Sequence, residues 1–94
     1  TVNNLMSTKI FVETIIKETR DKFFNVDNNM IKVKIDELLN LEPLEFYMHH
    51  LFIDYNFNFK EVIKIFNSDS GKFIISETHK LTKNKNLLII TRND

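Results

Sequence analysis

The stretch PLEFYMHHLFID, residues 43–54, carries the clearest structural signal in the chain. Its proline suits the first position of a helix, and Glu42 and Glu45 favour the positive end of the helix dipole. Apolar side chains recur every three or four residues from Leu44 to Tyr55, so they share one side of a helix. The stretch therefore predicts an amphipathic helix that buries one side.

A second helix is expected directly after the first. Asn56 can close the first helix in a left-handed conformation. Asn58, followed three residues later by Glu61, is a variant of the capping box that begins helices. Apolar residues over 59–67 again recur at helical spacing. The two helices predict a tight helical hairpin, residues 43–67.

The segment before this hairpin predicts a helix and a strand. Residues 5–24 show helical spacing of apolar side chains and predict a long amphipathic helix. Asn25 to Asn29 are polar and predict a turn. Residues 31–35 alternate apolar side chains with lysine, which is the period-2 pattern of a half-buried strand.

After the hairpin the pattern changes to strand. Gly71 is expected to occupy a turn that needs a positive φ. Residues 72–91 are rich in sheet-favouring side chains and predict an antiparallel β-ribbon. The fold class is therefore α+β, with a long N-terminal helix, a helical hairpin and a C-terminal ribbon in an order similar to a winged helix. We expect residues 1–94 to form a single domain.

Composition excludes several kinds of chemistry. The 94 residues are 43% hydrophobic and 28% charged, which is typical of a folded domain. One glycine excludes the glycine-rich loops that bind nucleotide phosphates, and the lack of cysteine excludes disulfides and thiolate sites. No apolar run approaches the about 20 residues that span a bilayer. These features predict no cofactor in this chain and no membrane association, and they are compatible with the cytoplasm.

Charge is unevenly distributed although thirteen basic and thirteen acidic residues sum to zero. Residues 36–59 carry five acidic side chains and no lysine or arginine, whereas residues 71–94 carry five basic and two acidic ones. If this domain meets phosphate, the ribbon is therefore the expected surface. The candidate phosphate-contacting residues are Lys72, Lys80, Lys83, Lys85 and Arg92.

Two side-chain groups could suggest a metal or a catalytic site. His50 and Asp54 are four residues apart on one helical face, but zinc sites need three or four protein ligands, so no metal site is predicted. Ser70, Ser76 and His79 lie close in sequence without a nucleophile elbow or an oxyanion loop. We therefore predict no catalytic residue in this chain.

The ribbon resembles a known family. The segments SGKF (70–73), SETHKL (76–81) and NKNLLI (84–89) are similar to tRNA(Ile)-lysidine synthase of the Bacteroidetes type, in the region beyond its catalytic domain. The resemblance covers roughly residues 31–91. Lysine stands at position 80 where the family usually has arginine. The motif residues that we expect to act structurally are Ser70, Gly71, Ser76, Thr78, His79 and Leu81.

The resemblance implies that the chain is a fragment of a larger bacterial enzyme, a ligase that uses ATP to attach lysine to the wobble cytidine of an isoleucine tRNA. ATP and Mg would bind in a separate N-terminal pyrophosphatase-type domain with an SGGxDS loop, which this sequence lacks. The present chain would be a non-catalytic module that docks tRNA and contacts the catalytic domain. Residues 5–24 would be the helix that connects the two.

Two other functions remain open. The chain could be a stand-alone or dimerising protein-interaction domain that uses the exposed side of helix 5–24. It could also be a winged-helix-like nucleic-acid-binding domain with 59–67 as the recognition helix. That helix offers Lys60 and Lys64, offset by Glu61, which is few cations for a duplex.

Overall fold

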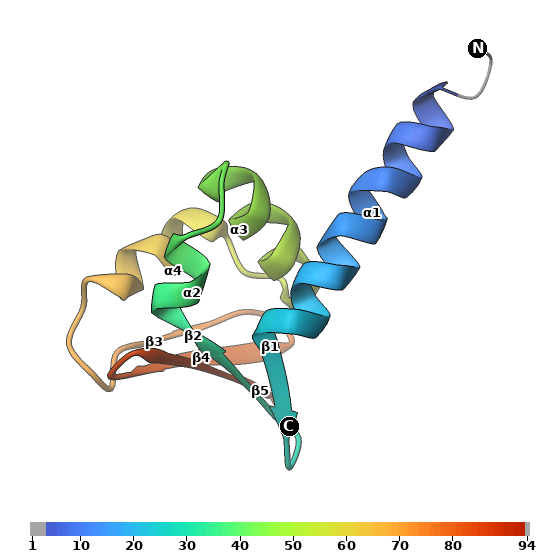
Figure 1. The fold of residues 1–94 in the computed structure, drawn as a ribbon. Helices are drawn as coiled ribbons and strands as arrows, with labels where there is room; N and C mark the ends of the chain where they lie inside the picture. The colour runs from blue at the N-terminus through green and yellow to red at the C-terminus, as the bar shows by residue number, and fades with distance from the viewer. Residues whose placement is uncertain (1–3, 94) are drawn as a thin grey trace.

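The computed structural model describes residues 4–93, which fold as helices on a five-stranded sheet (Figure 1). The elements are α1 (Asn4–Phe23), β1 (Phe24–Asp27), β2 (Met30–Lys34), α2 (Ile35–Leu39), α3 (Leu44–Phe52), the 3-10 helix η1 (Ile53–Tyr55), α4 (Phe59–Phe66), β3 (Phe73–Ile75), β4 (His79–Asn84) and β5 (Leu87–Arg92). Helices and strands alternate in groups along one chain, so the predicted α+β class is confirmed.

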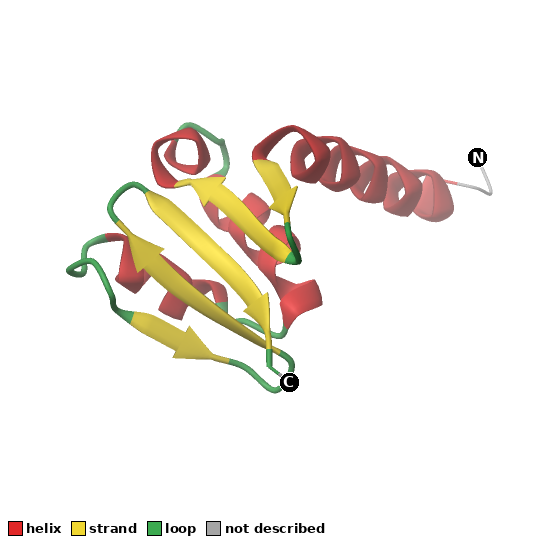
Figure 2. Ribbon diagram, turned by 90° about the horizontal axis from the view of Figure 1, so that it is seen from below, coloured by secondary structure: helices red, strands yellow, loops and turns green. Residues whose placement is uncertain are grey.

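The five strands form an antiparallel sheet in the order β1-β2-β5-β4-β3. In its register Ile90 lies opposite both Leu81 and Ile31, and directly opposed residues point to the same face. Helices α2, α3 and α4 cover that face, and Figure 2 shows the other face uncovered in front of the helices. The molecule is therefore a two-layer structure with one open sheet face.

The core lies between the covered sheet face and the helices. Helix α3 contributes Met48, Leu51 and Phe52, which are fully buried. The sheet contributes Val33, Leu81, Leu88 and Ile90, and the shorter helices add further apolar side chains. The buried core residues are Ile16, Phe24, Val33, Ile35, Leu38, Met48, Leu51, Phe52, Phe57, Val62, Ile65, Leu81, Leu88 and Ile90.

The hairpin begins and ends close to its predicted positions. Pro43 is the N-cap of α3 rather than its first helical residue, with extended backbone. Asn56 has the predicted left-handed conformation, with a φ of 64°. At the start of α4 the Asn58 side-chain oxygen accepts a hydrogen bond of 2.9 Å from the Lys60 N–H. Local signals therefore located both helices.

Two strand predictions need correction. Asn25 to Asn29 was predicted as a turn, but residues 25–27 belong to β1 and pair with β2, leaving Asn28 and Asn29 as the turn with positive φ. The predicted strand 31–35 begins one residue earlier and ends at Lys34, because Ile35 starts α2. The sequence of β1, FNVD, alternates apolar and polar residues over only four positions between the helix and the polar turn, which is too short a pattern to predict a strand.

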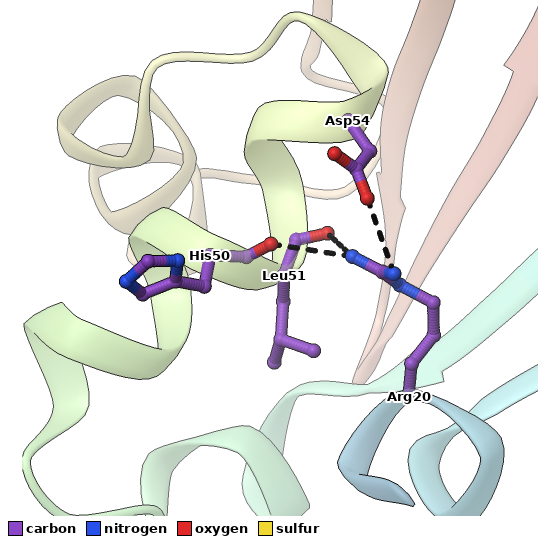
Figure 3. Close-up of polar contacts among 4 residues, drawn as sticks. All are labelled: Arg20, His50, Leu51 and Asp54. Carbon is purple, nitrogen blue, oxygen red and sulfur yellow. Dashed lines mark hydrogen bonds and ion pairs between the residues drawn. The ribbon is translucent and has the colours of Figure 1, made fainter. Parts of the chain in front are cut away.

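Helix α1 projects from the body of the molecule and touches it at its C-terminal end, next to β1 and α3 (Figure 1). Arg20 makes the polar link. Its Nη2 donates to the carbonyl oxygens of His50 (3.2 Å) and Leu51 (3.0 Å), and its Nη1 lies 3.2 Å from Asp54 Oδ2 (Figure 3). The guanidinium thus binds the C-terminal end of α3, where the helix dipole is negative.

Gly71 has the predicted positive φ, +96°, and its N–H donates to the Lys83 carbonyl at 2.7 Å. An added methyl group would meet no atom within 4 Å. We therefore expect Gly71→Ala to lower the free energy of unfolding by about 1–2 kcal/mol through backbone strain alone. Urea unfolding followed by circular dichroism measures this. Asp69→Ala in the same loop is the control, and an unchanged midpoint for Gly71→Ala would contradict the strain argument.

Candidate nucleic-acid interface

The open face of the sheet combines lysines with exposed apolar side chains. Because Val33, Leu81 and Ile90 point towards the helices, strand alternation directs their neighbours to the opposite side. We call this side the open face. Its side chains are Asn25, Asp27, Met30, Lys32, Lys34, Phe73, Ile75, Lys80, Thr82, Asn84, Leu87, Ile89 and Thr91.

The open face is basic while the helical layer is acidic. Lys32, Lys34 and Lys80 lie on it, and the carboxylate it carries is Asp27, which pairs with Lys32 at 3.6 Å. The acidic block 36–59 forms α2, α3, η1 and their connections on the other side of the sheet. The charge that is separated along the sequence is therefore also separated in space, and the basic side is open to a polyanion.

Among the predicted phosphate-contacting residues, Lys80 lies on the open face. Its Nζ is 4.4 Å from the centroid of the Phe73 ring, in a cation–π contact. Lys72 directly precedes β3 and lines a hollow of about 300 Å³ at the sheet edge, together with Lys64 of α4. One cation, Lys80, therefore lies over the exposed ring, while Lys72 and Lys64 share the hollow with Glu61.

The remaining predicted cations lie elsewhere. Lys83 is directed towards the helical side, where its Nζ donates to the Ser68 carbonyl at 2.7 Å. Arg92 follows the same alternation at the end of β5, beside His79. Lys85 is in the β4–β5 turn with a φ of 57°, and its N–H donates to Ser70 Oγ at 2.8 Å. The structure therefore does not bring the five predicted cations onto one face.

Sequence reasoning missed Lys32 and Lys34 as members of this surface. Both alternate with buried residues in β2, so the pattern placed them on one side of a strand. The missing information was the partner of that strand: β2 pairs with β5, which pairs with β4. This pairing joins residues more than fifty positions apart, and no local signal reports it.

The motif turn Ser76–His79 fastens the sheet to the helical layer. Ser76 Oγ donates to the Tyr55 carbonyl at 2.7 Å and accepts the His79 N–H at 3.0 Å. Thr78 Oγ1 accepts from Asn56 Nδ2 at 2.9 Å. The turn therefore joins β3 and β4 to the corner between η1 and α4.

His79 takes part in the same turn as a neutral ring. Loss of solvent around it, followed by the charge of Arg92, lowers the pKa of His79 below its ordinary value. Its Nδ1 lies 2.6 Å from Thr78 Oγ1, and its ring meets the Tyr55 ring edge-on at 5.0 Å. Burial raises the pKa of Tyr55, so both rings are uncharged at neutral pH.

A metal-binding group of three or more side chains and a membrane-spanning helix are both absent from the part of the chain that the structure describes. In residues 4–93 no group of three or more histidine, aspartate or glutamate side chains is arranged to hold a metal ion. In the candidate pair of His50 and Asp54, the Asp54 carboxylate binds Arg20, whereas the His50 ring points away from both and only its main-chain carbonyl accepts from Arg20 (Figure 3). No helix in this range has the length and hydropathy to cross a membrane.

Comparison with known proteins gives one match. A family model described as the TilS substrate binding domain matches residues 26–93. The match runs from the second half of β1 to just past the end of β5, and all of α1 lies outside it. No curated protein and no solved structure matches the chain. The similarity in element order to a winged helix therefore stays a prediction.

Proposed function

The chain belongs to the TilS substrate-binding domain family, and from this premise we propose that it docks tRNA for a tRNA(Ile)-lysidine synthase. The observation that carries the proposal is the family match over residues 26–93, which includes strands β2 to β5 and the second half of β1. The parent enzyme would attach lysine to the wobble cytidine of an isoleucine tRNA in the cytoplasm. This module would supply position and not chemistry.

ATP and Mg would belong to the catalytic domain of that parent. Loops that bind the phosphates of a nucleoside triphosphate are rich in glycine. This chain has one glycine, Gly71, and its N–H already donates to the Lys83 carbonyl. Helix α1 precedes the whole matched region, and Arg20 links it to α3. We propose that α1 connects the docking module to the catalytic domain.

The open face is the surface that we propose for tRNA. Lys32, Lys34 and Lys80 would contact backbone phosphates, with Lys72 and Lys85 near its margins. Phosphate contacts set the position and orientation of a nucleic acid, whereas base contacts read its sequence. A neutral chain with one basic face would orient tRNA through that face while adding little long-range attraction.

Removing two of these charges tests the proposal. In the full-length enzyme that contains this chain, we expect Lys32→Gln combined with Lys80→Gln to weaken binding of isoleucine tRNA. The slope of log affinity against log salt concentration should fall by about 1.4–1.8, because each lost phosphate contact removes about 0.7–0.9. Filter binding over a series of salt concentrations measures both quantities.

The matched control is Lys60→Gln, which removes an exposed lysine from the helical side of the molecule. It should leave the affinity and the salt slope unchanged. A second double variant, Lys83→Gln combined with Arg92→Gln, removes cations that lie on the helical side of the sheet. It therefore tests those cations separately from the lysines of the open face. If that pair lowers the slope while the Lys32 and Lys80 pair does not, the open face is not the docking surface.

A further inference from the structure

Phe73 is an aromatic ring on the surface that the domain would present to RNA. Its side chain is 52% exposed on the open face, in β3 at the edge of the sheet. Among the phenylalanine and tyrosine rings of residues 8–93, Phe11 and Phe73 are the two that are more than half exposed. Phe11 lies on the projecting helix α1, so Phe73 is the exposed ring that belongs to the sheet.

One lysine lies over this ring, and two others line the hollow at the sheet edge, which also contains Glu61. Lys80 Nζ, from the neighbouring strand, is 4.4 Å from the ring centroid. Lys72 precedes Phe73 in the chain and lines the hollow at the sheet edge together with Lys64. Because β3 is an edge strand, no further strand covers the ring on its outer side. The ring is therefore reachable by a flat group from its outer side, with the Lys80 ammonium over it.

This arrangement fits a nucleotide whose base is not paired. A base stacks on an aromatic ring, and its phosphates bind nearby cations. Exposed Ile75, two residues along the same strand, extends the apolar surface for a second base. An RNA duplex offers no free base face, since its bases are stacked inside the helix. Phosphate contacts alone would not use Phe73.

We propose that the open face binds unpaired nucleotides of tRNA, in a loop or at a single-stranded end, by stacking a base on Phe73 with a phosphate on Lys80. This inference rests on the proposed docking function and adds the kind of tRNA segment that is bound. It differs from general phosphate attraction because it requires a ring.

The experiment compares a short single-stranded RNA with a duplex of the same sequence, measured by fluorescence anisotropy on the full-length enzyme. Stacking of one base predicts that Phe73→Ala weakens single-strand binding by roughly 5- to 100-fold and changes duplex binding little. Phe73→Tyr keeps a stacking ring and should bind nearly as the original protein does. Phe11→Ala removes the other exposed ring and should have no effect on either RNA.

A second pair of probes separates the two possible tRNA segments. The original protein and Phe73→Ala are each tested with an isolated anticodon stem-loop and with a tRNA that lacks its single-stranded 3′ end. If Phe73 binds the anticodon loop, the substitution weakens binding of both RNAs. If Phe73 binds the 3′ end, the substitution changes binding of neither. Melting temperatures of all variants should agree, because the ring is exposed. Phe73→Leu, which keeps an apolar side chain without a ring, should behave as Phe73→Ala.

The outcomes distinguish this inference from the docking function. If Phe73→Ala binds single strands as the original protein does, or weakens both RNAs equally, while the Lys32 and Lys80 variants lose tRNA affinity, stacking is wrong and docking stands. If the original enzyme binds isoleucine tRNA independently of this domain, both are wrong.

Discussion

Replacing Phe52 with alanine is expected to remove about 3–5 kcal/mol from the free energy of unfolding. Phe52 is the largest of the fully buried side chains, with 0% exposure. Its ring lies 5.7 Å from that of Phe24, so it joins α3 to the first strand of the sheet. The substitution removes these contacts and leaves a cavity that the surrounding core fills incompletely.

The effect is large because the domain has a single core on one side of its sheet. Small domains are stable by about 5–15 kcal/mol in total, so the loss would bring this one close to unfolding at room temperature. Urea denaturation followed by circular dichroism measures the change. Phe11→Ala, at a ring that is 63% exposed, is the matched control and should stay within about 0.5 kcal/mol. A loss below about 1 kcal/mol for Phe52→Ala would contradict this account of the core.

The helices could be predicted from the sequence because their signals are local. The apolar spacing of α3, the Asn58 cap of α4 and the left-handed Asn56 each depend on residues within one or two turns. The sheet was predicted less completely. The segment 72–91 was expected to be a ribbon, but β5 also pairs with β2, which extends it into a five-stranded sheet. Pairing between distant segments depends on the packed core, and local patterns do not encode it.

The candidate site could likewise be predicted from local sequence only in part. The basic character of the ribbon followed from composition, but its division between two faces follows from strand alternation. Lys80 and Lys83 are three positions apart in one strand, so they point to opposite faces. The sequence alone predicts these opposite directions once residues 79–84 are assigned to one continuous strand. Lys32 required the β2–β5 pairing, which brings it to the same face as Lys80.

The two-layer arrangement explains how a chain with zero net charge could bind a polyanion. The acidic residues of the block 36–59 are on the helical side, and Lys32, Lys34 and Lys80 are on the open face. The core is complete on one side of the sheet, so the other side does not have to be buried for stability. Exposed Phe73 and Ile75 therefore remain available for binding.

Replacing Arg20 with alanine is expected to lower the free energy of unfolding by about 2–3 kcal/mol and to loosen α1. The guanidinium donates to two carbonyls at the end of α3, and hydrogen bonds to charged groups contribute about 1.5–3 kcal/mol each before other losses are counted. It also lies 5.9 Å and 5.8 Å from the ring centroids of Phe24 and Tyr55. Urea denaturation and amide hydrogen exchange along α1 measure the two effects.

Two variants separate the carbonyl contacts from the ion pair. Asp54 is 65% exposed, so Asp54→Asn should cost no more than about 1 kcal/mol, because water weakens exposed ion pairs. Lys17→Ala, at an exposed position one turn earlier on α1, should change neither quantity. If Asp54→Asn costs as much as Arg20→Ala, the ion pair and not the α3 carbonyls holds the helix. If Arg20→Ala behaves like Lys17→Ala, the orientation of α1 depends on its apolar contacts, and Arg20 does not fix the direction in which α1 leaves the sheet and α3.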